Sequence, residues 1–409
     1  MKDTGEGGRL FRRRVFYIPG YDPFHPRRYR ELYRKEGTAQ AAISGYDLAL
    51  RPRRKGAGPY GWQVQTLIDG QGAAADVEVL VWSDMVKGSM SGGIAATYAQ
   101  LLRTAWIYLG SGALFRLARL RKGPVIAALY PIVMLLAQLA VSGLAGWAVG
   151  AVLAGLVPGI VGGLAGWVTG LAVVVAGLRF FRRQDHRILA YYLMHDYAYA
   201  AAWGGANPPA LEARMAQFRA IIAQAMAEDW DEVLVVGHSS GAHLGVSILA
   251  DLIRGGLPDR RPALGFLSLG QVVPMVSFLP RAGRLRADLH FLSARDELTW
   301  VDVTAPGDGC AFALCDPVSV TGVAPEGKRW PLVMSAAFTQ TLSPERWKAL
   351  RWKFFRLHFQ YLCAFDRPRD YDYFRITGGA VTLADRYAGR AASKSRIERA
   401  LSPHTSMVA

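Results

Sequence analysis

The longest uncharged run in the sequence limits the possible folds more than any other feature. Residues 123–178 carry no charge over 56 positions. A membrane-spanning helix needs roughly 20 apolar residues, so the run suits two helices and is too long for one. Pro158 and Gly159 together can end one helix and start the next. We therefore expect a hairpin with spans at about 125–148 and 157–178.

Glycines recur at helical spacing in both expected spans, where small residues let two helices approach closely in lipid. They are Gly143, Gly146 and Gly150, followed by Gly162, Gly163 and Gly166. An antiparallel pair of packed helices follows from this pattern. The alternative is a buried helical pair in a soluble core, which so long an uncharged run between basic flanks disfavours.

Basic residues flank the run on both sides. They are Arg116, Arg119, Arg121 and Lys122 before it, and Arg179, Arg182, Arg183 and Arg187 after it. Positive side chains accumulate on the cytoplasmic side of spanning helices. We therefore expect a two-span protein of a bacterial inner membrane, with the bulk of the chain in the cytoplasm.

Two segments before the run, 98–109 and 114–120, mix apolar, aromatic and basic residues at helical spacing. This pattern predicts helices that lie along the lipid headgroups. Ordinary amphipathic helices packed on a soluble domain fit it equally well.

The charge balance is strongly basic, with 48 Lys and Arg against 32 Asp and Glu and a net charge of +16. Such a balance is typical of proteins that meet nucleic acid or an anionic membrane. The basic runs match no nucleic-acid-binding module, so the lipid bilayer is the expected partner. Three cysteines without zinc-like spacing predict neither a disulfide framework nor a metal site, and we expect no cofactor.

A short motif near the middle of the chain carries the chemistry. Residues 231–236 form a β-branched run, Gly237-His-Ser-Ser-Gly241 follows, and 242–250 has a helical pattern. The order strand, Gly-x-Ser-x-Gly, helix resembles the α/β-hydrolase superfamily, in particular its lipases and esterases. The resemblance implies that Ser239 is the nucleophile, at a turn that exposes its oxygen beside a helix N-terminus.

The resemblance also implies an oxyanion hole after an earlier strand. Residues 14–18 are a plausible strand, and Pro19, Gly20 and Tyr21 follow it. The backbone amide of Tyr21 would then join that of Ser240 in binding the oxyanion. Members of the family often carry His-Gly in this loop, and Pro-Gly departs from that pattern. An ordinary β-turn is the alternative.

The family order of nucleophile, acid and histidine narrows the choice of base. Four histidines follow Ser239: His243, His290, His358 and His404. His243 precedes every acid, His290 lies in an apolar helical pattern, and His404 lies in a polar tail. His358 remains as the expected base, with a histidine in an aromatic core as the alternative.

Several aspartates compete for the role of triad acid. The strand expected at 299–304 ends in a loop that contains Asp308, where the family places its acid. Asp302 lies inside this strand and Asp296 before it, so each needs a different strand boundary. We rank Asp308 first, Asp302 second and Asp296 third, with Asp316 as a weaker fourth.

Strands expected near 14–19, 76–82, 231–236, 263–269 and 299–304 alternate with helical patterns, which predicts an α/β fold with a doubly wound, mostly parallel sheet. Two transmembrane helices would be inserted into this α/β-hydrolase fold. We expect hydrolase segments at 1–90 and 186–392, a membrane insertion at 91–185 and a disordered tail at 393–409.

The sequence therefore predicts a membrane-anchored serine hydrolase that cleaves a carboxylic ester of a hydrophobic or amphiphilic substrate through an acyl-enzyme. The catalytic domain would lie on the cytoplasmic side. A catalytically inactive membrane interaction protein with the same fold is the alternative. A transporter component is disfavoured because the spans hold no charge. Homo-oligomerisation stays open.

Overall fold

A computed structural model describes residues 9–53 and 60–408. Eight strands form one sheet in the order β2-β3-β4-β1-β5-β6-β7-β8, in which every neighbouring pair from β4 to β8 is parallel. The strands are β1 Phe11–Ile18, β2 Asp47–Pro52, β3 Gly61–Ile68, β4 Gln71–Val79, β5 Glu232–His238, β6 Ala263–Leu269, β7 Thr299–Thr304 and β8 Leu332–Ser335. The predicted α/β class with a mostly parallel sheet is confirmed.

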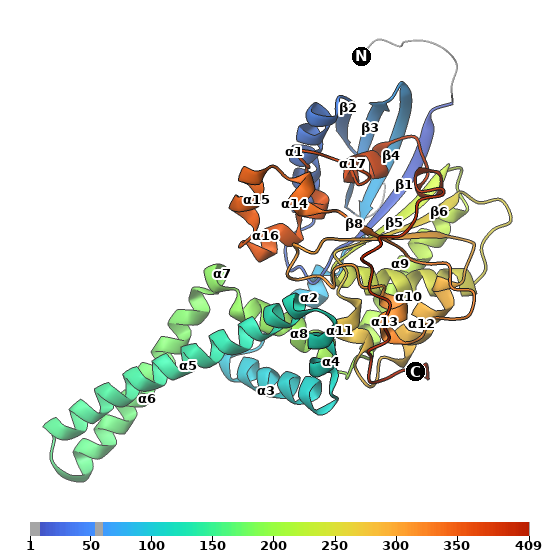
Figure 1. The fold of residues 1–409 in the computed structure, drawn as a ribbon. Helices are drawn as coiled ribbons and strands as arrows, with labels where there is room; N and C mark the ends of the chain where they lie inside the picture. Colours follow the sequence, from blue (N-terminus) through green and yellow to red (C-terminus); the bar gives the residue numbers. More distant parts are fainter. Residues whose placement is uncertain (1–8, 54–59, 409) are drawn as a thin grey trace.

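Helices cover both faces of this sheet (Figure 1). One face packs against α1 Arg27–Ser44 and the helices near the C-terminus: α14 Phe338–Thr341, α15 Pro344–Leu350, α16 Phe354–His358, the 3₁₀ turn η1 Gln360–Leu362, α17 Tyr373–Gly378 and α18 Leu383–Arg386. The other packs against α9 Pro209–Met226, α10 Ser240–Arg254, α11 Val273–Ser277, α12 Gly283–Ser293 and α13 Pro317–Thr321. Because both faces are covered, the central strands are largely buried, and β5 is buried at all seven positions.

Three strands lie outside the sequence-based expectation. β2 and β3 form an antiparallel extension at the edge beyond β4, and β8 closes the opposite edge with four residues. β2 is largely exposed and so lacks an apolar pattern. β4 also begins at Gln71, five residues before the expected strand, because its first half alternates between buried and partly exposed positions.

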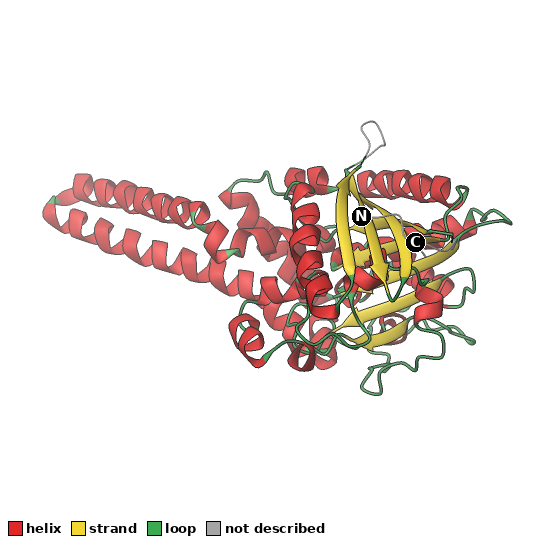
Figure 2. Cartoon of the chain, turned by 90° about the horizontal axis from the view of Figure 1, so that it is seen from above, coloured by secondary structure: helices red, strands yellow, loops and turns green. Residues whose placement is uncertain are grey.

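The uncharged run forms two long helices joined at Val157 and Pro158, where the sequence predicts the break. The segment between β4 and α9 comprises α2 Ser83–Ser89, α3 Ile94–Gly110, α4 Ala113–Leu120, α5 Lys122–Leu156, α6 Gly159–Arg183, α7 Asp185–Ile188 and α8 Ala190–Ala201. Both α5 and α6 are long and apolar enough to cross a membrane. They project together from the body of the protein (Figure 2), and most of their large apolar side chains are exposed.

Glycines hold the two hairpin helices in close contact. A Cβ atom on Gly150 would lie 2.6 Å from the carbonyl oxygen of Gly166, and one on Gly166 would lie 2.4 Å from that of Gly150. One turn away, Gly146 and Gly170 meet in the same way, at 2.5 and 2.7 Å. Since real Cβ atoms do not approach backbone atoms this closely, any larger residue at these positions forces the helices apart.

The helices before the hairpin are partly buried. Leu101 of α3 packs with Leu135 of α5 and with α8, while Leu117 of α4 packs against the body of the domain. The outer sides of α3 and α4 still expose Leu102, Trp106 and other apolar side chains. One side of these helices is thus packed on the protein, as the second alternative expects, and the other side exposes apolar residues.

The C-terminal segment corrects an expectation. Residues 393–408 are not a disordered tail, because their backbone bonds to the domain: the amides of Ser393, Ile397 and Leu401 donate to described carbonyl groups at 2.8, 2.7 and 3.0 Å. Leu401 is also buried. A polar composition suggested disorder, but backbone partners from distant segments order this stretch.

The glycine contact predicts a position-specific effect on stability. Gly150→Ala and Gly166→Ala should each lower the free energy of unfolding of the detergent-solubilised protein by about 1–3 kcal/mol, because the added methyl group overpacks the helix contact. Their melting temperatures should fall accordingly. Gly143→Ala and Gly163→Ala are matched controls, since a Cβ there meets nothing within 4 Å and alanine favours the helix. Equal melting temperatures in all four variants would contradict the contact.

Candidate active site

Ser239 occupies a strained turn between β5 and α10. Its backbone has φ 56° and ψ −121°, which is rare for a residue with a side chain. Crowding around the turn explains the neighbouring glycines: a Cβ on Gly241 would lie 2.1 Å from the carbonyl oxygen of Ile18, and one on Gly237 would lie 2.6 Å from that of Gly241. The strand therefore passes abruptly into the helix, and Ser239 stays half-buried at the rim of the sheet.

The loop after β1 lies against this serine. A Cβ on Gly20 would come within 2.9 Å of Cβ of Ser239 and 3.4 Å of its Oγ. The loop is held from two sides, because Nε1 of Trp82 donates to the carbonyl of Pro19 at 2.9 Å and the hydroxyl of Tyr192 donates to that of Tyr21 at 2.5 Å. Gly20 is therefore required for close approach.

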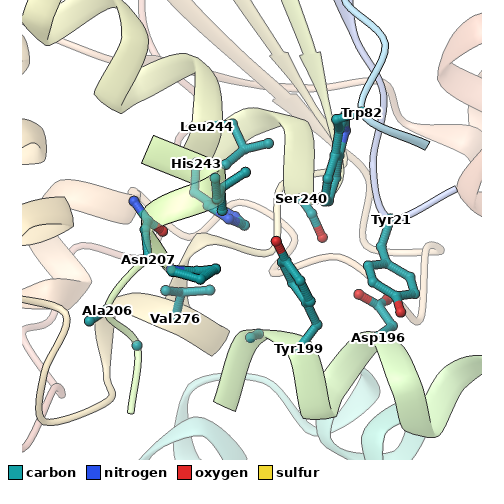
Figure 3. Close-up of a pocket in the computed structure, with 14 residues that line it drawn as sticks. Tyr21, Trp82, Asp196, Tyr199, Ala206, Asn207, Ser240, His243, Leu244 and Val276 are labelled. Carbon is teal, nitrogen blue, oxygen red and sulfur yellow. The ribbon is translucent and has the colours of Figure 1, made fainter. Parts of the chain in front are cut away.

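Tyr21 and Ser240 line one cavity (Figure 3). Neither of their backbone amides donates to an acceptor among the described residues. Ser240 is the first residue of α10, so its amide belongs to the helix end whose dipole favours negative charge. Two free N–H groups beside a hydroxyl can stabilise an oxyanion.

His358 and Asp308 form a buried pair. Nδ1 of His358 donates to Oδ2 of Asp308 at 2.7 Å, and the hydroxyl of Tyr361 donates to the same oxygen at 3.0 Å. The amide of Cys310 donates to the other carboxylate oxygen at 2.9 Å. Burial acts to raise the pKa of Asp308, but the charge of His358 and these hydrogen bonds outweigh it and lower the pKa. The carboxylate is therefore ionised and leaves Nε2 of His358 free to act as a base.

The imidazole of His358 lies beside the segment that also supports Ser239. A Cβ on Gly270 would be 3.1 Å from Cε1 of His358, and the amide of Ser239 donates to the carbonyl of the preceding Leu269 at 2.9 Å. Among the described residues, no hydrogen bond joins Oγ of Ser239 to His358. In enzymes without substrate, such bonds are often longer than in the reacting complex.

His238 is a positioning residue that the motif alone does not reveal. Its Nε2 donates to the carbonyl oxygen of His358 at 3.0 Å, and the two rings lie 4.9 Å apart. Burial, followed by the nearby charge of His358, lowers the pKa of His238 to about 3. The ring is therefore neutral and fixes the backbone that presents the expected base.

The other candidate acids lie apart from His358. Asp302 is fully buried in β7, where it accepts from the hydroxyl of Ser268 at 2.6 Å, and burial raises its pKa to about 8. Asp316 caps the N-terminus of α13. Asp296 lies 3.8 Å from Arg329 in an exposed ion pair. Of the four aspartates, the structure brings only Asp308 to the histidine.

The remaining histidines have other surroundings. Nδ1 of His290 lies 2.9 Å from the carbonyl oxygen of Val323, and His404 belongs to the ordered C-terminal segment. His243 lines the cavity beside Ser240, and burial lowers its pKa to about 4. It follows Ser239 by one helical turn on α10, as the sequence indicates.

Helix α8 supplies a wall of the cavity with Asp196 and Tyr199 (Figure 3). No described residue donates a hydrogen bond to the carboxyl group of Asp196. Burial raises its pKa to about 7, and the charge of His358 opposes this shift. A partly protonated carboxyl thus faces the cavity, which has a volume of about 30 Å³, close to that of one water molecule.

Asp308, Cys310 and His358 also place potential metal ligands within 4.8 Å of one another. A thiol must lose its proton to bind a metal. Burial, followed by the charge of Asp308, raises the pKa of Cys310 far above its ordinary value. The other two groups are already hydrogen-bonded to each other, so this cluster fits an acid–histidine pair better than a metal centre.

Comparisons with models of known protein families, with curated proteins and with solved structures found no match to this chain.

The arrangement separates the roles of two buried aspartates. If the site catalyses the acyl transfer expected from the sequence, Asp308→Asn should lower turnover by about four orders of magnitude, because the amide cannot hold the imidazole in the required tautomer. Asp302→Asn keeps a hydrogen-bond partner for Ser268 and should retain most activity. Turnover of a p-nitrophenyl ester by both purified variants tests this expectation, and the reverse ranking would make Asp302 the acid.

Asp302 should also make stability depend on pH. Its pKa of about 8 in the folded protein lies above the ordinary 3.8, so the folded state holds a proton that the unfolded state releases. Stability contributed by this group therefore falls as pH rises from about 4 to about 8. Thermal melts at pH 5 and pH 9 should differ less for Asp302→Asn than for the unchanged protein. If the melting temperature changes equally between pH 5 and pH 9 in both proteins, the raised pKa of Asp302 is contradicted.

Proposed function

We propose that this protein is a membrane-anchored serine hydrolase of the α/β-hydrolase type that cleaves carboxylic esters. The observation that carries the proposal is the buried Asp308–His358 hydrogen bond beside a serine held at φ 56°. Acyl transfer requires a nucleophile, a base and donors for the oxyanion. The site offers a strained serine at the N-terminus of α10, a histidine with one free nitrogen, and two free amides.

In the proposed reaction, Nε2 of His358 takes the proton of the Ser239 hydroxyl as its oxygen attacks the ester carbonyl. The amides of Tyr21 and Ser240 stabilise the negative oxygen, and Asp308 stabilises the imidazolium. His358 then gives the proton to the departing alcohol. His358 then takes a proton from water, whose oxygen attacks the acyl-enzyme, and returns this proton to the Ser239 oxygen as the acid leaves. No step calls for a group beyond these side chains and amides.

The hairpin supports a hydrophobic or amphiphilic substrate. Trp147 of α5 and Trp167 of α6 are 72 and 77% exposed among other apolar residues, so water is a poor solvent for this surface. A soluble core helix would instead be mostly buried. Insertion of α5 and α6 into a bilayer accounts for the exposure, and the basic residues at both ends favour the cytoplasmic side, for which a bacterial inner membrane is the proposed setting.

Helix α8 links the bilayer to the cavity. It follows the hairpin after α7, packs on α5 through Tyr191 and Met194, and carries Asp196 and Tyr199 into the cavity wall. A substrate that leaves the membrane along this helix would meet a carboxyl group near the serine. This group favours a hydroxyl or an amine next to the ester and repels a phosphate at that position.

A catalytically inactive interaction protein is the second candidate. The absence of a hydrogen bond between Ser239 and His358 among the described residues favours it. Retention of the strain at Ser239 argues the other way, because such a conformation costs about 1–3 kcal/mol and is kept mainly at functional sites.

An active-site probe separates the two candidates. A fluorophosphonate should label the detergent-solubilised protein and spare Ser239→Ala, since only an activated serine reacts. Ser240→Ala is the matched control, because its amide remains and it should still be labelled. Hydrolysis of p-nitrophenyl esters of graded chain length then ranks substrates. Absence of labelling in the unchanged protein, with the fold intact by circular dichroism, would favour the inactive candidate.

A further inference from the structure

A groove lies at the foot of the hairpin, between the start of α3 and the end of α6. Its volume is about 740 Å³, within the range of pockets that hold small ligands. Tyr98 of α3 and Val175 and Leu178 of α6 supply much of its apolar wall. Three arginines of α6 complete it: Arg179, Arg182 and Arg183. One groove thus joins an apolar surface to three positive charges.

No acidic side chain of the described residues forms an ion pair with these arginines. The acid that follows them in the chain, Asp185, is already used, because it accepts from the amides of Tyr191 and Tyr192 at 2.9 and 3.0 Å. Arg182 donates to the carbonyl oxygen of Gly92 at 2.9 Å, which fixes it at the groove edge. Arg179 and Arg183 are exposed. The groove therefore carries an unbalanced positive charge.

The groove also lies where the apolar surface of the hairpin ends. Leu171 and Val175 are exposed on the preceding turns of α6, and the first charge after the uncharged run is Arg179. In a bilayer this level is the plane of the lipid phosphates. A ligand at this level has its polar group beside the arginines and its apolar part along Val175 and Leu178.

We propose that this groove is a binding site for an anionic phospholipid. The headgroup phosphate would be bound by Arg179 and Arg183, with Arg182 beside them, and an acyl chain would lie against Val175 and Leu178. Guanidinium groups pair with phosphate through two parallel hydrogen bonds. Three positive charges favour a net negative headgroup over a zwitterionic one. The site depends on hairpin insertion and is independent of any chemistry at Ser239.

The binding test uses the full-length protein in dodecyl maltoside and three probes: dioctanoyl phosphatidylglycerol, dioctanoyl phosphatidylcholine and inorganic phosphate. Phosphatidylglycerol should raise the melting temperature in a saturable titration, and the other two should not at equal concentration. Arg179→Gln/Arg183→Gln should bind phosphatidylglycerol about thirtyfold more weakly, from the loss of two interfacial charges. This variant keeps Arg182 and its bond to Gly92.

Two further variants keep the test specific. Arg116→Gln/Arg119→Gln removes the same charge from exposed positions on α4, outside the groove, and should bind like the unchanged protein. Ala95→Trp fills the groove without changing charge and should weaken binding. If both double variants lose affinity for phosphatidylglycerol equally, or if phosphatidylcholine binds as tightly as phosphatidylglycerol, the effect is general attraction and the proposed site is overturned. Saturable stabilisation by inorganic phosphate alone would overturn the lipid assignment.

Discussion

The geometry of the candidate site depends on one constraint, the crowded turn at Ser239. Three segments meet there with no room for another carbon atom: the end of β5, the start of α10, and the end of β1 with the loop after it, which contact Gly241 and Ser239 through Ile18 and Gly20. The strain at the serine is stable only because surrounding parallel strands fix these segments. The same constraint brings Gly20, the residue before Tyr21, into contact with Ser239, the residue before Ser240.

The other two residues of the candidate site, Asp308 and His358, are positioned by elements outside the Gly-x-Ser-x-Gly motif. Asp308 follows β7 and His358 ends α16, far from Ser239 in sequence. Tyr361 and His238 bind the carboxylate and the histidine backbone respectively. The carboxylate thus has donors besides the imidazole, which lowers the cost of burying its charge, while His238 fixes the backbone of His358.

The parts of the molecule that follow from local chemistry were predictable. Ser239, the break beside Pro158 and β6 at 263–269 rest on turn residues or on continuous apolar runs. β2, β8 and the order of the C-terminal segment were not predictable, because distant hydrogen-bond partners create them. Asp196 was missed for a similar reason: only the packing of α8 brings it to the cavity.

Charge divides the part of the protein around the hairpin into two regions with opposite preferences. The groove at the end of α6 carries unpaired arginines, whereas the cavity wall on α8 carries Asp196 without a described donor. An anionic lipid is attracted to the first region and repelled by the ionised form of the second. Because α8 follows the hairpin and packs on α3 and α5, lipid in the groove and substrate in the cavity would contact one connected set of helices. Under the proposed function, an anionic lipid in the groove holds the protein at the bilayer without competing for Ser239.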